Sequence, residues 1–434
     1  MKPVNIGICG LGTVGSGVFN VMQRNRAEIN ARAGHDIRVT HVGARRDNPA
    51  CDLSQVIVER DVLNVAKAPD VDVVVELIGG CDIAKTLVLE AINHGKHVIT
   101  ANKALIALHG NEIFQAASEK NVGVYYEAAV AGGIPVIKAI REGLAANSIQ
   151  WVAGIINGTG NYILSEMRDH GRSFEDALAD AQALGYAEAD PSFDVDGIDA
   201  CHKLAILASL AFAIPLQFDK AFIEGIRHVE TQDVENAEEL GYRIKHLGIA
   251  KRVDSGVELR VHPTLVPDKR LLANVDGVMN AVLIQADAVG PTLYYGPGAG
   301  SEPTASSVIA DIVDLVRVMD VEPHLRVPSL AFHPGLLKED QIVEQSDIET
   351  ANYLRLQVID ELGVMSAITQ ILSGKGINIQ AMMQKEPKEG ESTVSLIILT
   401  NKVKESSLQA AISEIEELRA VEGKVTQIRM ESLN

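Results

Sequence analysis

The sequence predicts an α/β protein with three parts: a doubly wound parallel sheet, a second α+β domain and a C-terminal βαββαβ domain. Strands alternate with helical segments over residues 1–125, a glycine-rich turn follows the first strand, and residues 334–350 are polar and linker-like. With 434 residues the chain is long enough for two or three domains with full-sized cores. We expect the domains at 1–135, completed by about 298–330, at 136–297 and at 351–434.

The composition is that of a globular protein. Hydrophobic residues make up 47% of the chain and charged residues 22%. No apolar run approaches the length of a bilayer span, and the chain enters a strand without a signal peptide. Four cysteines without a CxxC pair indicate neither a disulfide framework nor a zinc site. Such cysteines are expected to be reduced, which indicates a cytoplasmic protein. The formal charge of −19 disfavours phosphate contacts, so we expect no binding of nucleic acid. We also expect no association with a membrane.

A glycine-rich turn follows the first predicted strand and opens the first helix. Its sequence is Gly10-Leu11-Gly12-Thr13-Val14-Gly15. In this GxGxxG pattern the first glycine permits the turn, the second lets the backbone approach a pyrophosphate, and the third lets the helix pack close to the strand. The pattern therefore predicts a Rossmann-type dinucleotide site, and a glycine-rich turn without a ligand is the alternative.

The end of the second strand bears on the choice of cofactor. NAD-preferring sites usually place an acidic residue there, to bind the ribose 2′-OH. Here Ile37–Ala44 is followed by Arg45 and Arg46. Two arginines suit a 2′-phosphate, so the sequence favours NADP over NAD, although a pair of surface arginines would have the same pattern.

Lys103 lies just past another predicted strand, 96–100. Ligands of open α/β sheets bind at the carboxyl ends of the strands. Lys103 is therefore a candidate to hold a phosphate or to orient a substrate, and a solvated loop lysine is the alternative.

An acidic segment, 186–204, holds five carboxylates in a loop with Pro and Gly, and a nearly apolar run, 205–214, follows it. Asp199 and Lys203 are four residues apart, which places them on one face of the predicted helix. Charges are costly to bury without a partner or a task. The pair is either part of a functional site or an ordinary ion pair at a helix end.

A turn of small residues, 127–135, connects a strand to a predicted helix at about 136–144. Such turns expose backbone carbonyl groups, which can bind a hard monovalent cation. A tight turn that holds nothing fits the sequence equally well.

Six segments together resemble bacterial homoserine dehydrogenases over nearly all of residues 1–330. They are the glycine turn, Thr100–Lys103, Glu127–Pro135, Gly154–Leu164, Gly185–Lys203, and Gly298–Gly300 with Pro303–Ser306. The sequence GYxExDP, followed by Asp and Lys at this spacing, is specific to that family, whereas GxGxxG is not. Gly160 is a small departure, because a threonine is more usual there.

The resemblance implies reversible hydride transfer between L-aspartate 4-semialdehyde and L-homoserine with NAD(P)H. Lys203 would be the general acid that protonates the carbonyl oxygen. Asp199 would hold Lys203 in position and adjust its pKa. Lys103 would help to fix the substrate and the nicotinamide. Glu188 and Asp194 would bind the substrate's ammonium group.

The resemblance also implies a second glycine loop, closed over the cofactor at Gly300. A monovalent cation, Na⁺ or K⁺, would be held by four backbone carbonyls, those of Glu127, Val130, Gly132 and Ile134. The assembly would be a homo-oligomer, either a dimer or a tetramer.

The chemistry of the residues agrees with these roles. Burial lowers the pKa of Lys203 and Asp199 raises it, which leaves a usable acid near neutral pH. An acidic loop also suits a substrate that carries an ammonium group. The nicotinamide supplies the hydride, and the protein positions the substrate and polarises its carbonyl group.

The C-terminal residues 353–429 show strands and helices in the order βαββαβ and resemble an ACT domain. That resemblance implies an amino-acid sensor, with L-threonine as feedback inhibitor bound between paired modules near Gly363 and Asn378. Such modules also serve only as dimer contacts, which is the alternative.

Two other functions compete with this one. A phosphorylating aldehyde dehydrogenase needs an activated cysteine, and neither Cys81 nor Cys201, the two best-placed candidates, has the surrounding sequence for it. A non-catalytic regulator that binds a dinucleotide and an amino acid has no need of a costly buried pair such as Asp199 and Lys203.

Overall fold

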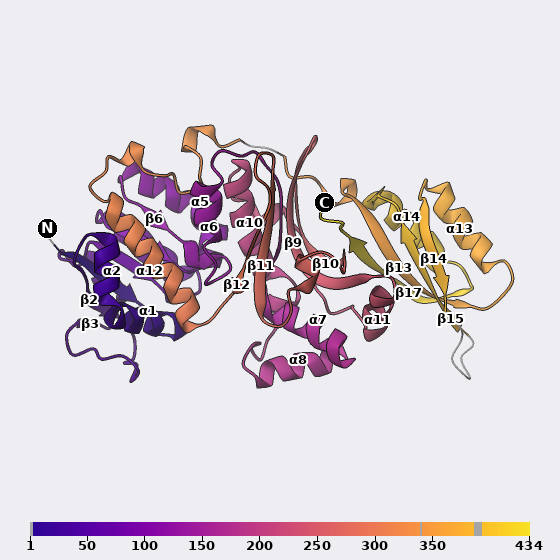
Figure 1. The fold of residues 1–434 in the computed structure, drawn as a ribbon, viewed down its shortest axis with the longest axis horizontal. Coiled ribbons are helices and arrows are strands. Elements are labelled where there is room, and N and C mark those ends of the chain that lie inside the picture. Colours follow the sequence, from indigo (N-terminus) through magenta and orange to yellow (C-terminus); the bar gives the residue numbers. More distant parts are fainter. Residues whose placement is uncertain (1–2, 339–340, 386–392) are drawn as a thin grey trace.

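The structure is a computed structural model that describes residues 3–338, 341–385 and 393–434. The chain forms an elongated molecule with the N-terminal domain at one end, the C-terminal domain at the other and a second domain between them (Figure 1). Within the described residues, no helix has the length and apolar character needed to cross a membrane.

The N-terminal domain is built on a six-stranded sheet in which every pairing is parallel. Its strands, in sheet order, are β3 (Ile57–Glu59), β2 (Ile37–Gly43), β1 (Val4–Cys9), β4 (Val73–Glu76), β5 (His97–Thr100) and β6 (Val124–Tyr125). The helices between them are α1 (Thr13–Arg24), α2 (Arg26–Ala33), α3 (Val62–Lys67), α4 (Asp82–Asn93) and α5 (Lys103–Glu119). The strand order reverses between β1 and β4, and a ligand of such a sheet binds at this reversal. The predicted doubly wound sheet is confirmed.

One helix of this domain comes from much later in the chain. Helix α12 (Ser301–Val318) packs against α1, and its buried residues Ala305, Val308 and Ile312 belong to the core of the N-terminal sheet. Its first hydroxyl, Ser301 Oγ, donates a hydrogen bond of 2.7 Å to the carbonyl of Thr13. The chain therefore returns to the glycine turn after it has built the second domain.

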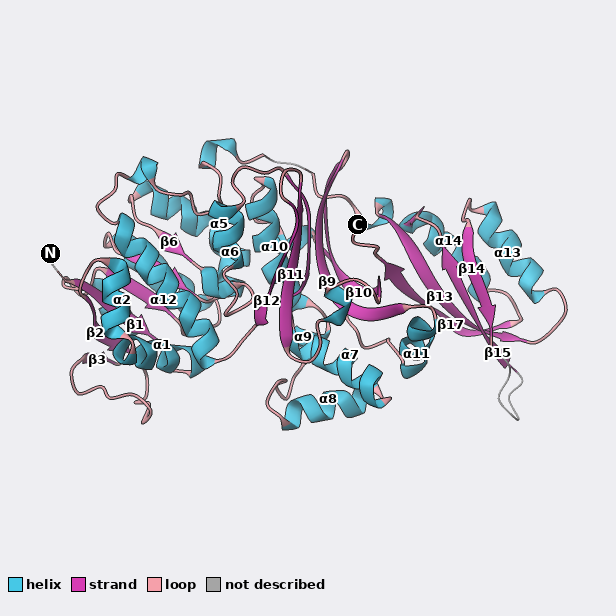
Figure 2. Cartoon of the chain, in the orientation of Figure 1, coloured by secondary structure: helices cyan, strands magenta, loops and turns pink. Residues whose placement is uncertain are grey.

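The second domain combines a mixed sheet with helices. Its strands are β7 (Ile149–Ile155), β8 (Phe222–Ile223), β9 (Tyr242–Val253), β10 (Gly256–Pro267), β11 (Met279–Ala286) and β12 (Gly290–Pro297). Its helices are α6 (Val136–Lys138), a π-helical turn η2 (Ala139–Gly143), α7 (Gly158–His170), α8 (Phe174–Ala183), α9 (Ser192–Val195), α10 (Ile198–Phe212) and α11 (Thr231–Glu239). Figure 2 shows α10 against this sheet. All residues of α10 but the first are buried, as its apolar sequence predicts.

The C-terminal domain has the predicted βαββαβ order. It consists of β13 (Glu349–Ile359), α13 (Val364–Gly374), β14 (Ile379–Gln384), β15 (Thr393–Thr400), α14 (Glu405–Glu416) and β17 (Val421–Met430), with the short strand β16 (Val403–Lys404) before α14. The four long strands lie in the order β17-β13-β15-β14. One face of this sheet and the two helices enclose a separate apolar core.

The sheets of the second and C-terminal domains are continuous, which the sequence does not predict. Strand β17 pairs in parallel with β10, with Thr264 opposite Arg429, and the joined sheet has eleven strands. Arg429 is buried at this junction, 2.6 Å from Glu405 of α14 and 2.7 Å from Glu224 of the second domain. The ACT-like domain is therefore attached to the second domain by backbone pairing and buried charge.

Candidate active site

Lys103 and Asp199 join the first two domains at the candidate site. Lys103 is the first residue of α5, directly after β5, and Asn102 caps that helix by accepting a hydrogen bond from the Leu105 amide. The Lys103 ammonium lies 2.8 Å from Oδ1 of Asp199 in α10. Lys103 is therefore not a solvated loop lysine, because it pairs with a carboxylate of the other domain.

Asp199 also pairs with Lys203, one turn further along α10. The Lys203 ammonium lies 2.7 Å from Oδ2 of Asp199 and donates a second hydrogen bond of 2.6 Å to the carbonyl of Ile156. Only 3% of Asp199 and 8% of Lys203 is exposed. The predicted pair is therefore buried, and one carboxylate separates two lysines.

The two lysines have opposite pKa shifts. Burial lowers the pKa of Lys203, the charge of Lys103 adds to that effect, and Asp199 only partly offsets it. At Lys103 burial also lowers the pKa, but Asp199 outweighs burial and the pKa is raised. Burial would raise the pKa of Asp199, yet the two lysines hold it below the ordinary value. Lys203 is therefore the stronger acid of the two lysines.

Asn157 brings a second carboxylate to this cluster. Its amide nitrogen donates to Asp194 Oδ1 at 2.7 Å and to Asp199 Oδ2 at 2.8 Å, while its Oδ1 caps α7 by accepting from the Gly160 amide. Burial raises the pKa of Asp194, the Asn157 hydrogen bond opposes that shift, and the charge of Asp199 adds to it. The sequence did not indicate the position of Asn157 between two acids.

Glu188 lies apart from the cluster in this structure. Its side chain is exposed, and its backbone carbonyl accepts a hydrogen bond from Gln182 Nε2 at 3.0 Å. Among the described residues, no contact joins the Glu188 carboxylate to Lys203, Asp199 or Asp194. Phe193, a residue that the sequence did not indicate, does contact the cluster: its ring centroid lies 5.8 Å from the Lys103 ammonium.

The glycine turn borders a cavity of about 960 Å³ at the carboxyl ends of the strands. A Cβ on Gly10 would lie 2.5 Å from the Leu77 carbonyl, and a Cβ on Gly15 would lie 1.9 Å from the Gly10 carbonyl, so both glycines are required by the fold. A Cβ on Gly12 would meet no atom within 4 Å. The space beside Gly12 thus fits the close approach of a pyrophosphate.

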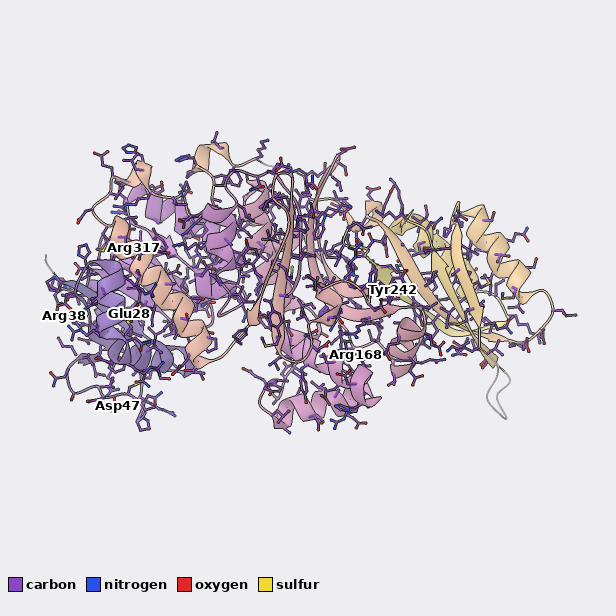
Figure 3. All side chains as sticks on the ribbon, viewed as in Figure 1. Glu28, Arg38, Asp47, Arg168, Tyr242 and Arg317 are labelled. Carbon is purple, nitrogen blue, oxygen red and sulfur yellow. The ribbon has the colours of Figure 1, made fainter. Side chains whose placement is uncertain are left out.

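Three arginines line the same cavity near the end of β2. Arg45 and Arg46 are exposed there, as the sequence predicts. Arg60 follows β3 and donates to the Ala44 carbonyl at 3.1 Å and to Asp47 at 2.8 Å, so the sequence missed a third arginine. Asp47 lies on the outside of the domain (Figure 3). This rim of the cavity is suited to an anionic group.

Thr13 and Val14 of the glycine turn lie at the start of α1, and Gly300 lies just before α12. Thr13 is the first residue of α1, and Val14 packs partly against the apolar core. Gly300 precedes α12 with φ of 122°, a conformation that favours glycine. The hydrogen bond from Ser301 to the Thr13 carbonyl places Gly300 beside the glycine turn.

The turn after β6 contains the four residues of the predicted cation site. The carbonyl of Ile134 accepts from the Val136 amide at 2.8 Å, and that of Glu127 accepts from the Val130 amide at 3.4 Å. Gly132 has φ of 47°, and a Cβ there would lie 2.4 Å from the Gly298 carbonyl. The turn therefore touches the second glycine loop.

The Glu127 side chain holds this turn in place. Its carboxylate accepts hydrogen bonds from the amides of Ile137 and Lys138 at 2.8 and 2.7 Å, and its own amide donates to Asp311 of α12 at 2.7 Å. Burial raises the pKa of Glu127 to about 7. The oxygen-rich, partly anionic surroundings fit a hard cation.

The two predicted effector residues lie at opposite ends of α13. Gly363 precedes this helix and Asn378 follows it, and both are exposed. A helix of this length spans roughly 16 Å. The structure therefore does not bring the two residues together within one chain.

Comparison with known proteins decides the family. Family models match residues 10–127 ("Homoserine dehydrogenase, NAD binding domain"), 135–313 ("Homoserine dehydrogenase") and 352–420 ("ACT domain"). The homoserine dehydrogenase of Pseudomonas aeruginosa is 61% identical over 434 residues, which cover 100% of both chains. The chain belongs to the homoserine dehydrogenase family.

Solved structures of the family have the same fold. A homoserine dehydrogenase from Thiobacillus denitrificans matches with a TM-score of 0.95 and 56% identity, over 100% of this chain and 99% of that chain. A hyperthermophilic archaeal homoserine dehydrogenase in complex with NADPH matches with a TM-score of 0.62 and 26% identity, over 72% of this chain and 98% of that chain. The N-terminal domain is thus a nicotinamide-dinucleotide-binding domain, and the C-terminal domain is an ACT domain.

Proposed function

We propose that this protein catalyses the reversible reduction of L-aspartate 4-semialdehyde to L-homoserine with NADPH or NADH. Membership of the family supports the reaction class. The single observation that carries the mechanism is the buried Asp199 between Lys103 and Lys203. The product would serve the biosynthesis of threonine, methionine and isoleucine in the cytoplasm.

Lys203 is the general acid of this mechanism. A nicotinamide bound at this site would supply a hydride to the aldehyde carbon. Lys203 transfers its proton to the carbonyl oxygen. In the reverse direction neutral Lys203 takes the hydroxyl proton of homoserine. A lowered pKa favours both steps, because it brings the amine closer to the working pH. Asp199 and the Ile156 carbonyl fix the position of the amine.

Other groups of the cluster bind the substrate. Asp194, held by Asn157, accepts the substrate's ammonium group, and Glu188 contributes from the exposed loop. Lys103 orients the substrate beside the nicotinamide, since its raised pKa keeps it charged. Recognition of an ammonium group by carboxylates explains an acidic loop beside two lysines.

The glycine-rich turn and the second glycine loop hold the cofactor. Backbone groups of five residues in the turn approach the pyrophosphate, and Gly300 closes the other side; the five are Gly10, Gly12, Thr13, Val14 and Gly15. Arg45 binds the 2′-phosphate, so NADP is preferred to NAD.

A monovalent cation, Na⁺ or K⁺, stabilises the turn between the domains. The carbonyl oxygens of Glu127, Val130, Gly132 and Ile134 would hold it. The contact of Gly132 with the Gly298 carbonyl supports a role in fixing the second glycine loop. The cation acts on the geometry of the site and takes no part in proton transfer.

The ACT domain carries regulation. L-Threonine binds between paired modules and inhibits the enzyme, which requires a homo-oligomer, a dimer or a tetramer. The placement of Gly363 and Asn378 at opposite ends of α13 supports a site that two chains share.

One experiment tests these proposals together. Nicotinamide absorbance is followed with L-homoserine and each cofactor, with and without L-threonine. We expect turnover with homoserine, a preference for NADP, and inhibition by threonine. No turnover with either cofactor would point to a non-catalytic regulator. Loss of all activity after thiol alkylation would instead favour a cysteine-dependent aldehyde dehydrogenase.

A further inference from the structure

A second cavity lies away from the site described above. It has a volume of about 730 Å³, and its lining includes no residue of the nucleotide cavity or of the Lys203 cluster. One wall is the C-terminal half of α5, and the opposite wall is the segment 323–337 after α12. In Figure 1 this segment is the orange chain that passes over α5. Its size lies within the usual range of ligand cavities, roughly 300–1,000 Å³.

The walls of this cavity are largely apolar. Phe114 and Tyr125 line it from the N-terminal domain, and Val327, Leu330 and Phe332 line it from the segment 323–337. The wall is firmly attached at one point, because the Tyr126 hydroxyl donates a hydrogen bond of 2.5 Å to the carbonyl of Ser329. The cavity is therefore a formed space that suits an apolar body.

A buried arginine marks one end of the cavity. Arg141 lines it, is only 6% exposed and lies 5.1 Å from the centroid of the Tyr125 ring. One of its terminal nitrogens is 3.1 Å from Glu142, but its Nε has no hydrogen-bond partner within residues 3–338, 341–385 and 393–434. A buried guanidinium nitrogen without an acceptor is costly. An acceptor from a ligand would satisfy this group after a small rearrangement.

The other charged groups of the lining favour an anion. Arg326 also lines the cavity, and its guanidinium donates to three backbone carbonyls, those of Val321, Asn121 and Met319. Backbone carbonyls do not neutralise its charge. Among the lining residues that the structure describes, His324 and His333 add two further basic side chains, and Glu119 is the one carboxylate. The described lining residues thus carry more basic than acidic groups, although Glu142 and Asp311 partly offset the charge of Arg141.

We propose that this cavity binds a small carboxylate with an aromatic or branched apolar body. The carboxylate lies against Arg141, and the body packs between Phe114 of α5 and the segment 323–337. Bidentate binding of a carboxylate is the geometry that a guanidinium favours. The proposal does not depend on the reaction of the first site.

Isothermal titration calorimetry with 2-naphthoate tests the proposal on the full-length protein, with saturating NADPH present to occupy the nucleotide cavity. We expect saturable binding with one site per chain. The neutral 2-naphthamide should bind at least about tenfold more weakly, because it lacks the charge that Arg141 pairs with.

Two variants locate the site. Arg141→Met keeps the apolar bulk and should weaken 2-naphthoate binding at least about tenfold while leaving 2-naphthamide unchanged. Val327→Trp, at a position that is 42% exposed, should fill the cavity and weaken both ligands. Arg419→Met, on the exposed surface of the ACT domain, is the matched control and should change neither.

Three results would overturn the proposal. They are the absence of saturable 2-naphthoate binding at millimolar concentration, equal affinity of Arg141→Met and the unaltered protein, and undiminished binding by Val327→Trp. Since Val327 is partly exposed, its replacement tests the site even if Arg141→Met fails to fold, which circular dichroism would show.

Discussion

The Lys103 ammonium of the N-terminal domain lies 2.8 Å from the carboxylate of Asp199 in the second domain. This contact joins the cofactor domain to the helix that carries Lys203. Because Asp199 also binds Lys203, one buried carboxylate sets the charge state of both lysines.

Asp199→Asn should shift the pH dependence of activity to lower pH. Reduction of the aldehyde needs protonated Lys203, so activity falls as pH rises through the pKa of Lys203, which burial places below the ordinary 10.5. Asp199 raises that pKa, and its removal lowers the pKa further. The basic limb of kcat/KM for reduction should therefore move to lower pH. Asp276→Asn, beside the buried Lys245, is the control and should leave this limb in place.

Gly12→Ala should weaken cofactor binding without harming the fold. Gly12 has φ of −70°, and a Cβ there meets no protein atom within 4 Å. The methyl group would occupy the space of the pyrophosphate, so Kd for NADPH should rise at least about tenfold, or about 1.4 kcal/mol. Fluorescence titration measures Kd, and calorimetry measures Tm.

Gly143→Ala is the control for the effect of an added methyl group. Gly143→Ala also adds a methyl group in open space, but outside the cavity, and should change neither Kd nor Tm. Normal NADPH affinity in Gly12→Ala would show that the cofactor does not approach the turn as proposed.

Replacing Arg45 and Arg46 together by Ala should reduce discrimination between the cofactors. The 2′-phosphate of NADP loses charge-assisted contacts, whereas NAD has no such group. We expect kcat/KM to fall at least about tenfold with NADPH and to change little with NADH. Arg38→Ala, on the preceding strand β2 and paired with Asp36, is the control. An equal loss with both cofactors would contradict a role in 2′-phosphate binding.

Arg429→Met should destabilise the junction of the second and ACT domains. The change removes the cationic partner of the buried Glu405, and breaking a buried ion pair costs about 3–5 kcal/mol. Urea denaturation followed by circular dichroism measures the loss, and the double variant with Glu405→Gln should recover part of it. Arg32→Met, which breaks the exposed pair with Glu28, should cost less than about 1 kcal/mol. Similar losses in both variants would argue against a buried junction.

Local patterns in the sequence predicted much of the fold and part of the site. The glycine turn, the strand alternation and the βαββαβ order are all short-range signals, and the structure has each of them. The spacing of Asp199 and Lys203 likewise placed both side chains on one face of α10. Helical periodicity is enough for such a pair.

Contacts between distant segments left no local signal. The Lys103–Asp199 pair spans two domains, and the pairing of β10 with β17 joins strands whose own sequences fit a sheet edge equally well. The contacts of Asn157 with two acids could not be predicted either, because those acids are supplied by α9 and α10. Glu188 is the glutamate of the GYxExDP sequence, yet its side chain is exposed. Its loop is held through the Glu188 backbone carbonyl, which accepts a hydrogen bond from Gln182.

The most direct test of the central claim is the turnover of Lys203→Ala with added methylamine. The account predicts that kcat falls by about 10²–10⁴-fold, that Kd for NADPH stays near normal, and that methylamine restores part of the activity by supplying the missing proton donor. Lys245→Met, which removes another buried lysine, should keep kcat and gain nothing from the amine. Undiminished turnover of Lys203→Ala would contradict the assignment of Lys203 as the general acid.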